Sequence, residues 1–86
     1  LPSAEILKKE LETINWVVSN QGNYYLKKTG CIIVVFKKDT EWCYMINDKI
    51  SEAKWPDAES AQRAAIEHLK EQLNLALKNN NEHFGL

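Results

Sequence analysis

The side chains best suited to catalysis or metal binding are two histidines and two cysteines. His68 and His83 stand at no spacing from a serine, cysteine or carboxylate that a catalytic motif requires. Cys31 and Cys43 form no CxxC pair and have no histidine at metal-ligand spacing. The three glycines are isolated, so a glycine-rich phosphate loop is absent as well. We therefore expect no enzyme activity, no metal and no cofactor, and we interpret His68 as a helix residue at the margin of an apolar stripe.

The two cysteines allow two interpretations. Both lie within or beside β-rich segments, and two are too few for a secreted disulfide scaffold. We expect reduced, semi-buried thiols that pack as small hydrophobic groups. A cross-strand disulfide is the alternative. Reduced thiols favour an intracellular, cytoplasmic protein.

Paired lysines accompany aromatic residues in the middle of the chain, and such a combination can follow a phosphate backbone and stack its bases. The candidate nucleic-acid-binding residues are Lys27, Lys28, Lys37 and Lys38. In an antiparallel meander, however, one pair precedes the second turn and the other precedes the third, so the pairs fall at opposite ends of the sheet. Lysine at strand ends also discourages edge-to-edge aggregation. Nucleic-acid binding is therefore the alternative function and not the leading one.

Composition and charge exclude several classes of protein. Eleven Lys and Arg against twelve Asp and Glu give a net charge of −1, so no overall field attracts the chain to nucleic acid or anionic lipid. The longest apolar run, Cys31 to Phe36, is far shorter than the roughly 20 residues that span a bilayer. With 44% hydrophobic residues over 86 positions, we expect one soluble domain and no membrane partner. Because the chain begins at Leu1 and not at Met, we expect a piece of a longer polypeptide.

The elements that position these residues begin with a helix over about residues 3–13, which Ser3 can cap. β-Rich segments cut by turn residues follow, and the expected strands cover 16–19, 24–28, 31–37 and 41–46. The segment 50–54 could add a short edge strand. A second helix begins after Asp57, and its apolar stripe recurs every four residues at Ala61, Ala65, Leu69, Leu73 and Leu77.

These elements predict an α+β fold in which a short antiparallel meander of three to four strands packs against an N-terminal helix and a longer C-terminal helix. We expect one compact domain over residues 1–78, a helix end at Asn79–Asn81 and a mobile tail over 79–86. The element order is similar to that of double-stranded RNA-binding domains. That resemblance implies lysines at the start of the last helix, whereas residues 55–59 read Trp-Pro-Asp-Ala-Glu here.

Both faces of the expected sheet are apolar near its middle. Cys31 to Phe36 is apolar at every position, and the fourth strand places Trp42 and Tyr44 on one side and Met45 on the other. Either the first helix and the 47–54 connector close the second face, or a partner does. The leading interpretation is a non-catalytic interaction module that binds a second copy or another protein, either as a homodimer or as an accessory to a larger assembly. Its candidate partner-binding residues are Tyr24, Trp42, Tyr44 and Trp55.

Overall fold

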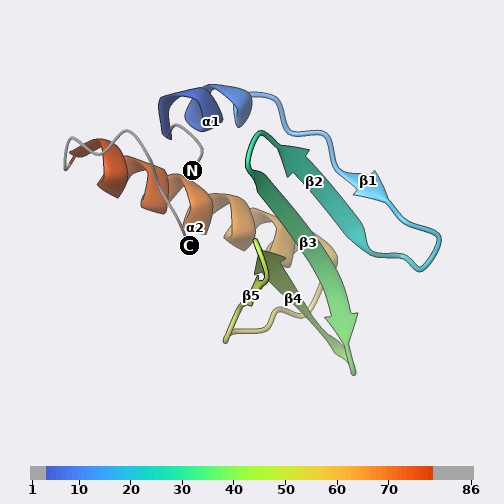
Figure 1. Cartoon of the computed structure of the whole chain (residues 1–86). Coiled ribbons are helices and arrows are strands. Elements are labelled where there is room, and N and C mark those ends of the chain that lie inside the picture. Colours follow the sequence, from blue (N-terminus) through green and yellow to red (C-terminus); the bar gives the residue numbers. More distant parts are fainter. Residues whose placement is uncertain (1–3, 79–86) are drawn as a thin grey trace.

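The computed structural model describes residues 4–78 as two helices and one five-stranded sheet (Figure 1). Along the chain the elements are α1 (Ala4–Glu10), β1 (Val17–Val18), β2 (Tyr24–Lys28), β3 (Cys31–Lys38), β4 (Glu41–Ile46), β5 (Lys49–Ile50) and α2 (Ala58–Lys78). Every strand pairs antiparallel with its neighbour in sequence, in the order β1-β2-β3-β4-β5. The expected α+β fold is confirmed, with five strands in place of three or four.

Helix α1 is shorter than the expected 3–13. Leu11 still donates its N–H to the carbonyl of Leu7 at 3.0 Å, but Glu12 donates to Lys9 at 3.1 Å, the tighter bond of a helix end. The Glu10 carboxylate then accepts bonds from the N–H and the hydroxyl of Thr29, at 2.7 and 2.6 Å. These two bonds tie the end of α1 to the turn between β2 and β3.

Positive-φ residues make the turns of the meander. Gly22 and Gly30 have φ of 84° and 72°, as their place in the expected turns suggests. Asn47 and Asp48 both have positive φ, the pattern of the two-residue hairpin loops that match strand twist. Asn47 also accepts a bond from the N–H of Ile32 at 2.9 Å through its side-chain oxygen. The last hairpin therefore stays attached to the start of β3.

The fifth strand begins at Lys49 and ends at Ile50, so it is shorter than the expected 50–54 segment. Beyond it the chain returns to β4 at a single bridge. Trp42 and Trp55 exchange two backbone hydrogen bonds there, at 2.7 and 2.8 Å. The connector is thus held at both of its ends before α2 begins.

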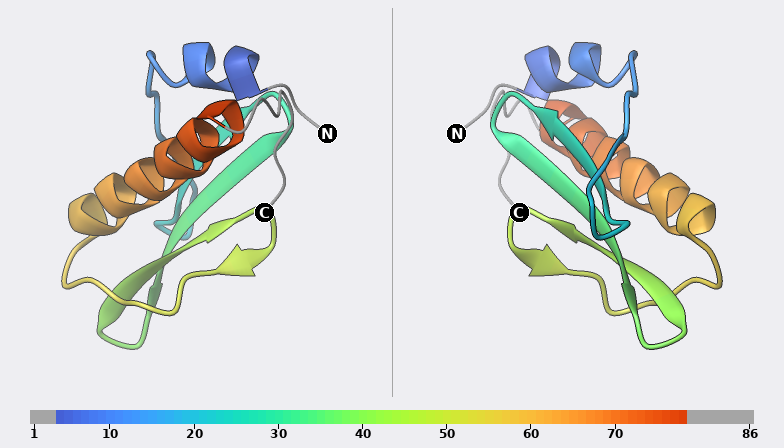
Figure 2. Two further views of the ribbon diagram at one scale, coloured as in Figure 1. Left: turned by 90° about the vertical axis from the view of Figure 1, so that its left-hand side faces the viewer. Right: turned by 90° about the vertical axis from the view of Figure 1, so that its right-hand side faces the viewer.

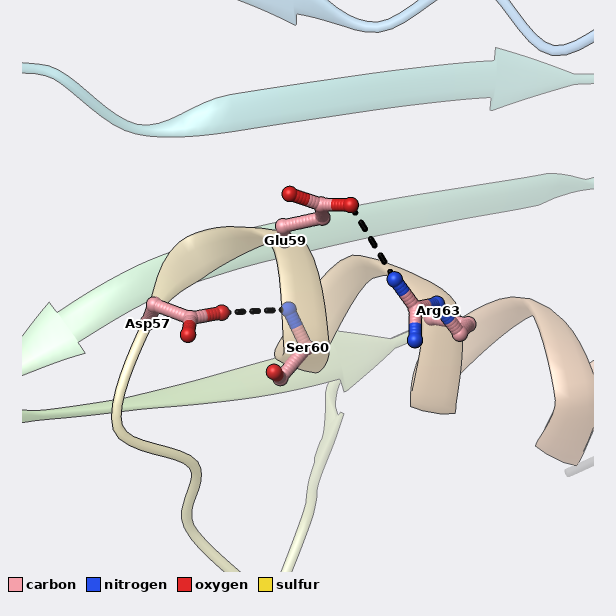
Figure 3. A network of polar contacts seen from close by, with 4 residues as sticks. All are labelled: Asp57, Glu59, Ser60 and Arg63. Atoms are coloured by element: carbon pink, nitrogen blue, oxygen red, sulfur yellow. Dashed lines mark hydrogen bonds and ion pairs between the residues drawn. The ribbon is translucent and has the colours of Figure 1, made fainter.

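Helix α2 begins as the sequence predicts. The Asp57 side chain accepts a 2.7 Å bond from the N–H of Ser60, and Glu59 pairs with Arg63 at 3.0 Å one turn along (Figure 3). The bond from the Ser60 N–H is the main reason that the pKa of Asp57 lies below its ordinary value. The buried stripe of α2 consists of Ala61, Ala65, Leu69, Leu73 and Ala76, so Ala76 takes the place expected for Leu77, which is only partly buried. The expected helix end at 79–81 and the tail lie outside the described residues.

Both helices lie on the same side of the sheet (Figure 2). Leu7 of α1, Leu26 of β2 and Leu73 of α2 belong to one buried cluster, together with the inward residues of β3 and β4. Helix α1 therefore adds to the core that α2 already covers, and it does not close the second face of the sheet.

Candidate interaction surfaces

A row of five apolar side chains crosses the sheet on the side away from the helices. Strand register places its members directly beside one another, one from each strand: Val17, Tyr25, Val34, Met45 and Ile50. The next register line, Leu26 with Ile33 and Ile46, is buried in the core. Because successive strand residues point to opposite faces, the row faces away from that core. We call it the outer row.

Two further apolar residues of β3 flank the outer row. Ile32 and Phe36 lie two positions before and after Val34, so they share its face of the sheet. Ile32 is 46% exposed and Phe36 is half-buried against Cys43, its neighbour across the strands. We call the outer row together with Ile32 and Phe36 the helix-free face.

The helix-free face is large for a chain of this size. Four of its side chains are substantially exposed, namely Val17 at 64%, Ile50 at 60%, Ile32 at 46% and Tyr25 at 38%. Together they present on the order of 400 Å² of mostly apolar surface, which matches the largest patch of a typical monomer, and such patches are often functional. Charged side chains on this side stand toward the strand ends, where Lys27 is paired with Ile32 and Lys38 with Glu41.

The four aromatic residues that the sequence singled out lie on the other side of the sheet. Tyr24, Trp42 and Trp55 are half-buried against the core, and Tyr44 is only 7% exposed. The rings of Tyr24 and Trp42 lie 6.0 Å apart, and the ring of Tyr44 stacks on that of Trp55 at 5.3 Å. Their role as partner anchors stays a prediction, with little surface left to Tyr44 for contact with a partner.

The partner-binding candidates drawn from the sequence omitted Tyr25, the aromatic residue of β2 that lies on the helix-free face. The available signal was strand alternation, because Tyr24 and Tyr25 must point to opposite sides once the strand is placed. Which of the two joins the core depends on the register with β3, where Tyr24 faces Val35 and Tyr25 faces Val34.

Sequence reasoning also missed the link between Tyr44 and His68. The Tyr44 hydroxyl lies 2.7 Å from Nδ1 of His68, and the two rings meet edge to face with centroids 5.9 Å apart. Burial raises the pKa of Tyr44 above its ordinary value. A signal was present, because a buried tyrosine hydroxyl usually requires a partner and a polar residue at the margin of the helix stripe can supply one.

These two residues lie at a cleft between the β4-β5 hairpin, the connector after it and α2. The cleft holds about 600 Å³. Six of its lining residues are Tyr44, Ile46, Lys49, Trp55, His68 and Gln72. Most of the cleft belongs to the helix side of the sheet, where Tyr44 and Ile46 of β4 lie, but its lining also includes Ile50 of the outer row.

The candidate nucleic-acid-binding lysines do not form one patch. Lys28 pairs with Cys31 at the start of β3, whereas Lys38 ends that strand and pairs with Glu41. At roughly 3.3 Å per residue the two positions are about 23 Å apart. Within each pair the neighbours also point to opposite faces, as Lys27 and Lys28 do. The two lysine pairs are therefore separated along the sheet, as the sequence implies. Nothing in their geometry favours the nucleic-acid alternative.

Both cysteines are free and buried. Cys31 lies in the core, whereas Cys43 is paired with Phe36 on the opposite face of the sheet, so the two thiols are not placed for a bond. Burial raises the pKa of Cys31 to about 11. Because the thiolate is the reactive form of cysteine, Cys31 is a poor nucleophile at neutral pH.

Within residues 4–78, no group of three or more His, Cys, Asp or Glu side chains is arranged to hold a metal ion. Over the same range, neither helix combines the length and the apolar character that crossing a bilayer demands. Comparison with known protein families, curated proteins and solved structures gave no match to this chain. Its function is therefore inferred from the two surfaces themselves.

Proposed function

We propose that this domain is a non-catalytic interaction module that pairs with a second copy of itself through the helix-free face. The single observation that supports the proposal is the outer row, which carries apolar side chains from all five strands and which neither described helix covers. Burying such a surface removes it from water and supplies the driving force for association.

The extent of the face agrees with what a dimer requires. A standard interface buries roughly 800 Å² on each partner, of which about 60% is apolar, or roughly 500 Å². The four most exposed side chains come close to that figure, and the partly exposed Val34, Met45 and Phe36 add to it. A second copy offers an identical apolar surface. The centre of this surface carries no charged side chain, so the partner needs no complementary charge there.

Sheet-on-sheet packing would accommodate the face. Two sheets stack about 10 Å apart with their strands roughly aligned, and side chains of the two inner faces interdigitate. A two-fold axis along the outer row would place Ile32 of one copy against Phe36 of the other, because both residues lie two positions from Val34. The contact of Ile32 with Phe36 would then occur twice, once in each direction across the interface, as a two-fold interface requires.

The test is the mass in solution of the wild type and of Ile32→Lys. We expect the wild type to be dimeric at micromolar concentration in sedimentation or light scattering. A lysine beside the outer row would have to lose its hydration on association, so the dissociation constant of Ile32→Lys should rise at least about tenfold. Because Ile32 is already half exposed in the single chain, circular dichroism should show an unchanged fold.

Ile6→Lys is the matched control. Ile6 is 55% exposed but lies on α1, away from the helix-free face, so this variant should remain dimeric. A wild type that stays monomeric at several hundred micromolar would contradict the proposal. So would equal dissociation by both substitutions, because the contact would then not reside on the sheet.

A further inference from the structure

The cleft between β4, β5 and α2 has the dimensions of a ligand site. Its volume of about 600 Å³ falls within the range of small-molecule pockets, roughly 300 to 1,000 Å³. Such pockets combine apolar and aromatic walls with a few convergent polar groups. The cleft has both kinds of lining, and among its lining residues only Ile50 belongs to the proposed dimer face.

One wall of the cleft is aromatic and held in place. The rings of Tyr44 and Trp55 are stacked with an interplanar angle of 28°. Tyr44 is buried, and Trp55 is fixed through its backbone by the two hydrogen bonds to Trp42. Ile46 adds apolar surface beside them. A wall of this kind favours a planar ring, because stacking on it requires little ordering of the protein.

The polar groups of the cleft are mainly hydrogen-bond donors. A phenol is the better donor and an imidazole nitrogen the better acceptor, so we assign the 2.7 Å bond as Tyr44 O–H to Nδ1 of His68. With this assignment, the N–H donor of the His68 ring is at Nε2. Gln72 lies one helical turn beyond His68 on the same side of α2, and its amide adds further donors.

The charge at the cleft comes from Lys49 of β5 and Glu52 of the connector. Within residues 4–78, neither side chain is engaged in an ion pair or a side-chain hydrogen bond, so Lys49 is free to meet an anion. A carboxylate can accept bonds from an ammonium, an imidazole N–H and an amide at once, and charge-assisted bonds of this kind are the strong ones. The Glu52 carboxylate repels any anion at the cleft, so Lys49, His68 and Gln72 must supply the attraction.

We propose that this cleft binds a small aromatic carboxylate, with its ring against Trp55, which stacks on the buried Tyr44, and its carboxylate toward His68, Gln72 and Lys49. The site goes beyond the proposed function, because these binding residues lie outside the helix-free face and only Ile50 lines both surfaces.

The test is a titration of the ¹⁵N-labelled protein with 2-naphthoate, followed by two-dimensional NMR. We expect shifts at the indole N–H of Trp55 and at the amides of residues 49, 68 and 72. The neutral isostere 2-naphthamide should bind at least about tenfold more weakly, because it lacks the charge-assisted bonds. Shifts confined to other residues, equal binding of the amide, or no binding of 2-naphthoate at millimolar concentration would each overturn the proposal.

Two lysine variants complete the experiment. Lys49→Gln should weaken 2-naphthoate binding about three- to tenfold and leave 2-naphthamide binding unchanged, because only the charge is removed. Lys27→Gln makes the same change on the other side of the sheet and should leave both affinities unaltered. Equal effects of the two variants would show that binding follows net charge and not the cleft, and would refute the assignment.

Discussion

At the scale of single residues, a step of one position decides whether an aromatic side chain stabilises the core or stays exposed to solvent. Tyr24 packs with Trp42 on the helix side, whereas Tyr25 lies in the outer row. The same rule separates Tyr44, which is buried against His68, from Met45, which belongs to the outer row. Residue type alone does not distinguish these neighbours, because all four are suited to a β-strand.

The bond between Tyr44 and His68 leads to a prediction about stability. Tyr44→Phe keeps the ring in place but removes the hydroxyl, so His68 loses its partner. We expect the free energy of unfolding to fall by about 1 kcal/mol, the usual contribution of such a bond. Urea denaturation monitored by circular dichroism measures it.

Tyr24→Phe serves as the control for this measurement. Tyr24 lies on the helix side, outside the proposed dimer face, and within the described residues its hydroxyl makes no side-chain hydrogen bond, so removing that hydroxyl should leave stability unchanged. Equal midpoints for Tyr44→Phe and the wild type would mean that the bond to His68 contributes nothing in solution.

At the scale of elements, a carboxylate secures one end of each helix. Glu10 attaches α1 to the turn at Thr29, and Asp57 caps α2 at Ser60. Hydrogen bonds from Thr29, the hydroxyl first and then the backbone N–H, lower the pKa of Glu10, and bonds from Ser60 lower that of Asp57. Both groups are therefore stronger acids in the folded chain than in the unfolded one.

The sign of the resulting pH dependence follows from these lowered pKa values. Each carboxylate contributes stability that is fully present above its unfolded pKa and is lost as the pH falls through its folded pKa. We expect the urea midpoint to be flat near neutrality and to decrease below about pH 5. Asp57→Asn should keep the cap and reduce this decrease, because asparagine caps helices nearly as well but carries no charge.

Asp57→Ala distinguishes the cap from the charge. It should lower the midpoint at every pH, since the alanine side chain accepts no bond from Ser60. Identical pH profiles for the wild type and Asp57→Asn would show that the charge of Asp57 does not contribute.

At the scale of the whole molecule, the domain has two layers. Two helices and one face of the sheet share a single core, and α1 packs beside α2 instead of on the opposite side (Figure 2). Over residues 4–78, both helices thus lie on the same face of the sheet. The outer row remains exposed, and association is the means by which such a face is removed from water.

Self-association predicts that thermal stability depends on protein concentration. A dimer that dissociates on unfolding is stabilised by mass action, so raising the concentration about a hundredfold should raise Tm by several degrees. Differential scanning calorimetry of the wild type measures this. Ile32→Lys, whose dimer should be at least about tenfold weaker, should show a smaller rise in Tm over the same range. A concentration-independent Tm in the wild type would argue against the dimer.

The sequence by itself determined the local structure. The Asp57 cap, the positive φ of Gly22 and Gly30 and the buried stripe of α2 follow from bonds and periodicities within a few residues, so they could be predicted without knowledge of the fold. The order of strands also followed, because short turns join neighbours in an antiparallel meander. The predicted boundaries of α1 and β5 were less accurate. Both elements end where the chain makes hydrogen bonds to another segment, namely from Thr29 to Glu10 at the end of α1 and from Ser51 to Tyr44 after β5.

Only the tertiary structure decided which residues could form a binding surface. The outer row gathers residues from position 17 to position 50 and exists only in one strand register, and the contact between Tyr44 and His68 spans 24 positions. The side on which α1 packs depends equally on distant partners such as Leu26 and Leu73. Such juxtapositions arise from the balance of burial over the whole chain, and no local pattern encodes them.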